Sequence, residues 1–282
     1  MSETTAIARV AKLFIYLLLI ILAVMSIFPF FIMLVNATRS TPQIQQQAIS
    51  FIPSTYLYSN MQILSDRGAF SSLLGFRNSI IVAGGTTVLS LYFSSLTAFA
   101  LVAYNWRVRQ AFFTFIMAVM MIPALVGAIG YARLIWQFDL QNTFLPLILP
   151  AIAAPTIVFF MRQYLIATFS IDIVNSGRID GANEFRIFNQ IVLPMMKPAV
   201  ATQAIFIFVA SWNTLFLPRI LLTSTDMFTM PLMVGLLNAD IYRTEFGAIY
   251  LALGLSVLPL FALYFALSRY IIAGVQLGGV KE

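Results

Sequence analysis

The chain contains no cysteine and no histidine, and only 9% of its 282 residues are charged. Without cysteine no disulfide can form, and without either residue type the usual metal ligands and the commonest nucleophile–base pairs are missing. Serine–lysine and paired-carboxylate chemistry stay formally open. The lysines, however, lie near expected membrane edges or in the tail, at Lys12, Lys197 and Lys281. We therefore expect no catalytic residue and no metal site.

The scarcity of charge points to the membrane, because soluble domains carry about 25% charged residues. A membrane helix needs about 20 mostly apolar residues. Uncharged apolar intervals of that length lie at 13–38, 78–106, 110–132, 140–161, 198–218 and 246–268. They predict six transmembrane helices. The net charge of +6 would suggest a nucleic-acid partner in a soluble protein. Here we assign it to loops that fix orientation, and we expect no nucleic acid.

Lysines and arginines predict which side of the membrane each loop occupies. With both termini inside, ten of them are cytoplasmic and six are external. The positive-inside rule favours this orientation and places the segment 170–198 in the cytoplasm. The first apolar segment is too long for a signal peptide and no cleavage site follows it, so we expect it to remain as a helix. The prediction is a multi-pass protein of the cytoplasmic (inner) membrane.

Ser170–Pro198 is the longest segment in the second half of the chain where charge gathers, and it lies between long uncharged blocks. Asp180-Gly181 is a turn signal, and apolar residues recur at helical spacing on both sides of it. Asn183 is expected to be a helix N-cap. The pattern predicts two short helices joined at a glycine, although a solvated loop is the simpler interpretation of such a polar segment.

Motifs in the second half resemble the permease subunits of ABC importers, in particular the second permease of maltose-type systems. The resemblance rests on the run Arg178–Ala182 (RIDGA), on Phe185 and Phe188, and on Ile191–Pro194 (IVLP). The run SWNTLFLP, with its aromatic residue displaced to Phe216, and the tail GVQLGGVKE are similar to further signatures of that family. The family's Glu-Ala-Ala falls on Asn175-Ser176-Gly177, so its glutamate is lost here.

The resemblance implies an all-α membrane protein with the type I ABC importer permease fold: six transmembrane helices and a cytoplasmic coupling-helix hairpin. The implied division is 1–76 (tail, first helix and external segment), 77–268 (permease core with coupling loop 164–198) and 269–282 (cytoplasmic tail). The function implied is a permease subunit of an ATP-driven, binding-protein-dependent importer of a sugar or oligosaccharide. Its expected partners are a second, non-identical permease, two ATP-binding subunits, an extracytoplasmic solute-binding protein and the lipid bilayer.

The chain has no G-x-x-x-x-G-K-[ST] phosphate loop, so we expect no cofactor in it, and ATP and Mg on the partner subunits. By resemblance, the residues expected to dock the ATPase are Asn175, Ser176, Gly177, Arg178, Asp180, Gly181, Ala182, Glu184, Phe185, Arg186, Phe188, Gly279 and Lys281. Ser94, Trp212 and Asn213 are candidates for the solute path. The external loop 219–245 is the candidate contact for the binding protein.

Two other classes of function remain as alternatives. An ion-coupled secondary transporter generally keeps ionisable residues inside the membrane, and the six intervals contain none. A membrane scaffold that transports nothing would not need the hairpin pattern. The solute stays open between a disaccharide, a longer oligosaccharide and glycerol phosphate, because the polar residues of the spans do not separate them.

Overall fold

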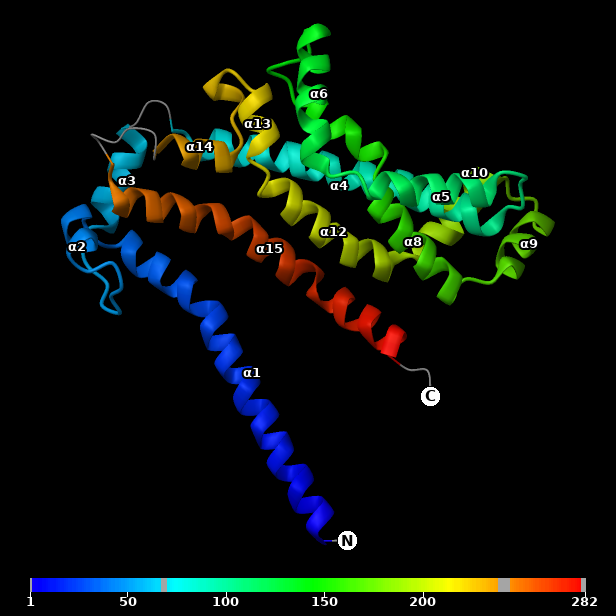
Figure 1. The fold of residues 1–282 in the computed structure, drawn as a ribbon, viewed down its shortest axis with the longest axis horizontal. Helices are drawn as coiled ribbons and strands as arrows, with labels where there is room; N and C mark the ends of the chain where they lie inside the picture. The colour runs from blue at the N-terminus through cyan, green and yellow to red at the C-terminus, as the bar shows by residue number, and fades with distance from the viewer. Residues whose placement is uncertain (1, 67–69, 238–243, 280–282) are drawn as a thin grey trace. The chain divides into compact units, whose positions relative to one another are not determined.

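The computed structural model describes residues 2–66, 70–237 and 244–279, and over these ranges the chain is helical with no strand (Figure 1). The longer helices are α1 (Ser2–Ala37), α4 (Ser72–Ala103), α5 (Arg109–Met120), α6 (Ala124–Gln137), α8 (Pro155–Thr168), α12 (Lys197–Trp212) and α15 (Phe246–Gly279). The shorter ones are α2 (Thr41–Gln46), α3 (Leu57–Asp66), α7 (Leu145–Ile148), α9 (Ile171–Ile179), α10 (Glu184–Ile187), α11 (Leu193–Met195), α13 (Phe216–Leu221) and α14 (Met230–Leu237). The predicted all-α membrane class is confirmed.

Four helical segments of the described chain are long and apolar enough to cross a membrane alone: Ala11–Ala37, Ser72–Ala103, Leu145–Thr168 and Phe246–Ser268. Two bent pairs, Arg109–Met120 with Leu125–Gln137 and Glu184–Met195 with Lys197–Trp212, reach that length only together. The described residues therefore contain six crossings if each bent pair is one span. The number of crossings stays a prediction.

Prolines break two of the expected helices. The helix expected in the interval 110–132 ends at Met120 and restarts at Ala124, with Pro123 extended at φ −61° and ψ 122°. The helix expected in the interval 140–161 is divided into α7, a 3₁₀ turn over Leu149–Ile152, and α8. Proline lacks the backbone N–H and disfavours helical geometry in the residue before it, so each break has a local cause.

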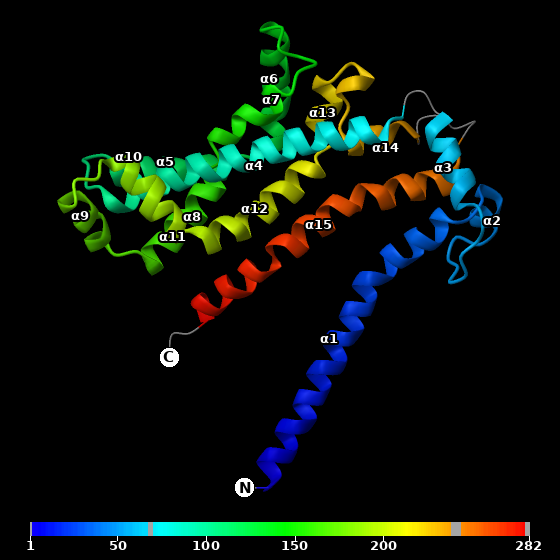
Figure 2. The same ribbon diagram turned by 180° about the vertical axis from the view of Figure 1, so that it is seen from behind.

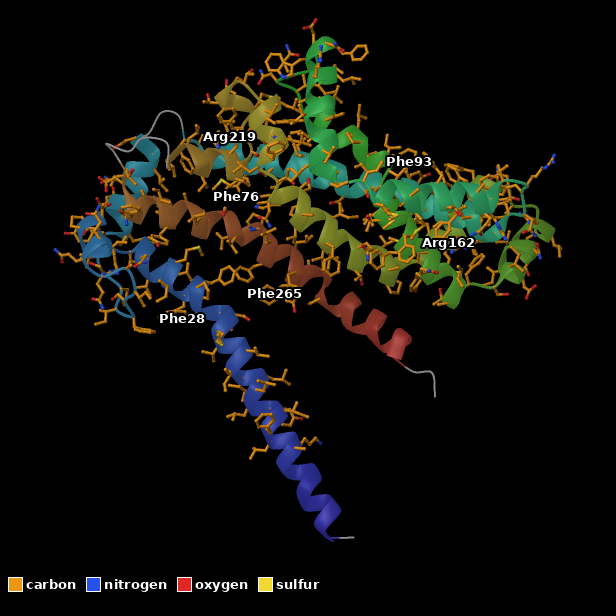
Figure 3. All side chains as sticks on the ribbon, in the orientation of Figure 1. Phe28, Phe76, Phe93, Arg162, Arg219 and Phe265 are labelled. Atoms are coloured by element: carbon orange, nitrogen blue, oxygen red, sulfur yellow. The ribbon has the colours of Figure 1, made fainter. Side chains whose placement is uncertain are left out.

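The chain forms two compact units, Met1–Ser71 with Val234–Val257 and Ser72–Met233 with Leu258–Glu282. In the first unit, α1 carries exposed apolar side chains all round from Leu13 to Leu34, as Figure 3 shows. A helix that is apolar on every face belongs in lipid or inside a larger assembly. Beyond α1, the buried Arg39 guanidinium donates to Asn36 Oδ1 at 2.9 Å and to the carbonyl oxygens of Gln43 and Gln47.

In the second unit, α4, α8 and α12 run side by side, and α9 and α10 lie at one end of them (Figures 1 and 2). A buried cluster joins this end of the helices to the α9–α10 segment. It contains Leu91, Ala98, Phe99, Met161, Leu165, Val174, Ile187, Phe188, Val192 and Met196. Next to it, α5 packs against α8, and the Arg162 guanidinium lies 4.0 Å from the centroid of the Phe113 ring.

Candidate coupling hairpin and solute cavity

The segment 170–187 folds as the predicted pair of short helices, α9 and α10. Ser170 caps α9 by accepting a hydrogen bond from the backbone N–H of Asp172. Gly181, with φ +78°, occupies the left-handed region that glycine adopts without a steric cost. Asn183 then caps α10, its Oδ1 accepting from the N–H of Arg186 at 2.8 Å. The glycine joint and the asparagine N-cap are both confirmed, and we call residues 170–192, which include the π-helical turn after α10, the coupling hairpin.

The coupling hairpin is fixed to the long helices by aromatic packing. The Phe188 side chain is 1% exposed and lies 5.7 Å, centroid to centroid, from both Phe99 and Tyr92 of α4. Gly177 permits close contact inside the hairpin, because an added Cβ would lie 3.2 Å from Ile191 Cδ1. A π-helical turn over Phe188–Val192 directly follows α10. Displacing the hairpin therefore requires α4 to move or this packing to break.

The tip of the coupling hairpin, in contrast to the buried residues around Phe188, is exposed. Ile179 is 86% exposed and Phe185 is 72% exposed, one on each side of the glycine joint. Asp180 and Arg186 are also exposed. Large apolar side chains surrounded by charged ones are the composition of a protein–protein contact. The tip is thus an exposed surface of mixed apolar and charged character.

A hydrogen-bonded group on the inner side of the hairpin joins α9, α10 and the end of α4. Arg178 Nε donates to Glu184 Oε1 at 2.7 Å, and the Tyr104 hydroxyl donates to Glu184 Oε2. The Arg178 guanidinium also lies 5.6 Å from the centroid of the Tyr104 ring. Both charged side chains are partly exposed, so solvent screens the ion pair and it contributes little to stability. Its main effect is to fix the angle between the two short helices.

These contacts shift the pKa values of the group. Hydrogen bonds from Arg178 and then from Tyr104 stabilise the carboxylate and lower the pKa of Glu184. Burial and the hydrogen bond to Glu184 raise the pKa of Tyr104 to about 12. The hydrogen bond to Glu184 also raises the pKa of Arg178. At neutral pH the carboxylate is charged and the phenol keeps its proton, so the three groups hold one hydrogen-bond pattern.

The thirteen residues predicted to dock the ATPase separate into three sets. Exposed on the hairpin are Asn175, Ser176, Arg178, Asp180, Gly181, Glu184, Phe185 and Arg186, with Ala182 partly exposed. Gly177 and Phe188 are buried within this chain. Both pack against other residues of this chain. Gly279 is the last residue of α15, and Lys281 lies outside the described residues.

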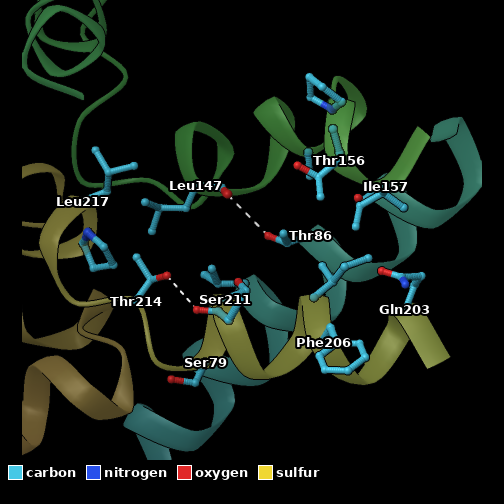
Figure 4. A pocket seen from close by; sticks show the side chains of 18 of the residues that line it. Ser79, Thr86, Leu147, Thr156, Ile157, Gln203, Phe206, Ser211, Thr214 and Leu217 are labelled. Atoms are coloured by element: carbon cyan, nitrogen blue, oxygen red, sulfur yellow. Dashed lines mark hydrogen bonds between the residues drawn. The ribbon is translucent and has the colours of Figure 1, made fainter. Parts of the chain in front are cut away.

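A cavity of about 980 Å³ lies among α4, α7, α8, α12 and α13 (Figure 4). Its polar lining is neutral and comprises Ser79, Thr86, Ser90, Thr156, Thr202, Gln203, Ser211, Thr214 and Thr229. Phe160 and Phe206 contribute apolar rings. Thr86 Oγ1 donates to the carbonyl oxygen of Leu147 at 3.4 Å, one of the dashed lines in Figure 4. The cavity has the size and mixed lining of a small-molecule site.

The three residues proposed for the solute path do not line this cavity. Ser94 is fully buried, with its hydroxyl 3.5 Å from the carbonyl oxygen of Ala154. The buried Trp212 indole stacks on Phe208 with centroids 5.6 Å apart, while Asn213 is exposed just beyond α12. The structure instead brings Ser90 and Thr214, close to them in sequence, to the cavity wall.

Part of the loop proposed to meet the binding protein is fixed to the start of α4. Asn78 Nδ2 donates to the carbonyl oxygens of Asp226 and Phe228 at 2.7 and 2.9 Å. Ser79 Oγ accepts from the N–H of Met230 at 2.8 Å. Gly75 allows this approach, because an added Cβ would lie 3.1 Å from Met230 Sδ. Residues 238–243 of the loop lie outside the described residues.

Comparison with known proteins identifies the class that these features define. Residues 90–276 match the family described as the binding-protein-dependent transport system inner membrane component. An arabinooligosaccharide transport permease of Halalkalibacterium halodurans is 33% identical, with 92% of this chain and 93% of the relative covered. The lactose transport permease of Rhizobium radiobacter is 32% identical, with 99% of both chains covered.

A third relative, the sn-glycerol-3-phosphate transport permease of Escherichia coli strain K12, is 26% identical over 93% of this chain and 95% of its own. A solved bacterial ABC transporter involved in import of the acidic polysaccharide alginate matches with a TM-score of 0.80. The match is at 20% identity, with 93% of this chain and 97% of that one covered, and it shows the fold.

The chain therefore belongs to the family of inner-membrane components of binding-protein-dependent transport systems. It is a permease subunit of an ABC importer, a class that works with an ATPase and a solute-binding protein. The resemblance found in its motifs is confirmed.

Proposed function

We propose that this permease carries a sugar or oligosaccharide inward, driven by ATP that separate subunits hydrolyse with Mg. Both termini and the coupling hairpin face the cytoplasm, where two ATP-binding subunits bind the tip. A second, non-identical permease completes the path, and an external binding protein delivers the solute. The arabinooligosaccharide and lactose permeases among the relatives support this class of solute.

The observation that carries the proposal is the contrast between the two ends of the hairpin. Ile179 and Phe185 are exposed at the tip, whereas Phe188 is buried against Phe99 and Tyr92. A partner that holds the tip therefore moves α4 through packed aromatic rings rather than through a loose loop. Packed interfaces switch between discrete arrangements, which is what alternating access requires. The packing of Phe188 against Phe99 and Tyr92 does not involve Asn175, where the family's glutamate is lost.

The test is uptake by the purified four-part assembly, consisting of both permeases, the ATPase and the binding protein, in proteoliposomes. Radiolabelled lactose and arabinotriose are the probes, added on the side that holds the binding protein. ATP-dependent accumulation of at least one of them is expected, with no response to a proton or sodium gradient. Accumulation that follows an ion gradient and ignores ATP would assign the chain to the secondary-transporter class instead.

A further inference from the structure

A second cavity extends the first toward the coupling hairpin. It measures about 310 Å³ and is lined by Phe160, Gln163, Tyr164, Pro198, Ala199, Thr202 and Gln203. Phe160, Thr202 and Gln203 line both cavities. The two spaces therefore meet at these side chains and follow α12 along its length. An elongated pair of this kind has the layout of a path rather than of a closed binding site.

The lining has one chemical character throughout. None of the residues that line either cavity is ionisable except Tyr164, and its hydroxyl donates to the carbonyl oxygen of Met195 at 3.4 Å. The remaining polar groups are hydroxyls and the amides of Gln203 and Gln163. Hydroxyls and amides both donate and accept hydrogen bonds, as sugar hydroxyls do. A phosphate or carboxylate would find no cationic partner among the residues that line the two cavities.

One buried hydroxyl points to a ligand. The Thr229 side chain is 4% exposed and lines the larger cavity, and its Oγ1 makes no hydrogen bond within the described protein. Buried polar atoms are rarely left unpaired, because each costs about 1–3 kcal/mol. The neighbouring Ser79 hydroxyl is satisfied by the N–H of Met230. The Thr229 hydroxyl is therefore available for a hydrogen bond to a polar solute, or to a water molecule that accompanies it, in the cavity.

Aromatic rings complete the lining at the junction. Figure 4 shows Gln203 and Phe206 of α12 lying across the cavity from Thr156 and Ile157 of α8. The Phe206 ring is largely exposed, and Phe160 borders both cavities. The C–H faces of sugar rings pack against such surfaces, while the neighbouring amide and hydroxyls meet the ring hydroxyls. Sparse polar groups on an apolar wall guide a solute without retaining it.

We infer that these joined cavities form this chain's part of the solute path, that Gln203 is its main polar contact, and that the path selects uncharged, polyhydroxylated solutes. The inference rests on the proposed function and narrows it. The relatives include a permease for sn-glycerol-3-phosphate, which is an anion. The neutral lining separates this chain from that solute class.

The absence of cysteine from the chain makes a direct test possible. Gln203→Cys in the assembled transporter is treated with a charged, membrane-impermeant thiosulfonate, and this chain's single thiol is followed by mass spectrometry. Thr97→Cys is the matched control, since Thr97 lies on α4 but lines neither cavity. Labelling at 203 above that at 97, slowed by lactose or arabinotriose and not by sn-glycerol-3-phosphate, is expected. An unlabelled thiol at 203, or protection by the phosphate ester alone, would overturn the inference.

Uptake provides a second readout. Gln203→Leu removes one amide contact of about 1 kcal/mol and should slow sugar uptake about fivefold. Gln203→Asn should restore part of the rate, and Thr97→Val should leave it unchanged. If the wild-type assembly imports neither sugar, the proposed function fails, and labelling at 203 still reports whether the cavity is open. If it imports a sugar while Gln203→Leu matches the wild type and the thiol is unlabelled, the cavity inference alone fails.

Discussion

Replacing Gly181 tests whether the coupling hairpin must keep its shape. Its φ of +78° places it in the left-handed region, and nothing lies within 4 Å of an added Cβ. Gly181→Ala therefore causes no clash. Its cost is that of holding a non-glycine residue at positive φ, about 1 kcal/mol, which lowers the population of the native turn about fivefold. Gly181→Asn should cost less, because asparagine tolerates this region.

Gly181→Pro is more severe, because proline holds φ near −65° and cannot donate a backbone hydrogen bond. The N–H of Gly181 donates to the carbonyl oxygen of Arg178 at 3.0 Å. The two losses together cost about 3 kcal/mol or more, over a hundredfold in the population of the native turn. The buried cluster around Phe188 touches this turn through Ala182, but its buried members lie outside residues 178–182, so the protein should still fold.

The assay compares ATP hydrolysis and sugar uptake by the reconstituted assembly. The number of sugars imported per ATP should fall in the order glycine, asparagine, alanine, proline, with the proline variant uncoupled or unable to bind its ATPase. Gly130→Ala is the control, because Gly130 is helical, lies outside the proposed contact surfaces and also has nothing within 4 Å of an added Cβ. If the proline variant imported as many sugars per ATP as the wild type, the proposal that the hairpin transmits motion from the ATPase to α4 would be wrong.

Three further outcomes follow from the same contacts. Glu184→Gln should lower uptake per ATP only modestly, because exposed ion pairs are weak, and Tyr104→Phe should act in the same direction. Equal uptake per ATP in the wild type and both variants would argue against a role for the group. Because the pKa of Glu184 is lowered by its partners, its stabilising contribution is present above the unfolded value of 4.5 and is lost as pH falls through the lower folded value. The hydrogen-exchange protection of residues 178–187, corrected for the intrinsic exchange rate, should thus be independent of pH above about 5. It should decrease only below that pH. Asn78→Ala removes two hydrogen bonds to the loop at 226–228 and should destabilise the folded position of that loop by about 1–3 kcal/mol. Proteolysis at 226–228 should then be faster. Unchanged cleavage would show that other contacts hold the loop.

The sequence predicts the local structure of the coupling hairpin well, because its signals are local. A glycine at positive φ and an asparagine three residues before the N–H it accepts from are short-range features. The division of the spans was less predictable. Charge-free length locates the apolar segments, yet Pro123 breaks one of them where a continuous helix was expected. Length alone does not say whether a proline kinks a helix or ends it.

Contacts between distant residues were beyond a single sequence. Glu184 was expected to face a partner, but it also binds Tyr104, 80 residues away. The bonds from Asn78 to residues 226 and 228 likewise appear only in the fold. The side chains of the cavity were missed for the same reason. Thr86, Thr156 and Gln203 are unremarkable in sequence and meet only when α4, α8 and α12 pack together. Exposed Ile179 was also missed as a docking residue, although its position between polar neighbours was a usable signal.

The central claim is that the hairpin tip binds the ATPase, and one cross-linking measurement tests it most directly. Phe185→Cys is the single thiol of this chain and can carry a photoactivatable maleimide in the purified, assembled transporter. The account predicts an adduct between residue 185 and the ATP-binding subunit, abolished when that subunit is omitted. Adducts with lipid or with the external binding protein alone, or labelling of this thiol by an impermeant reagent from outside the cell, would contradict it.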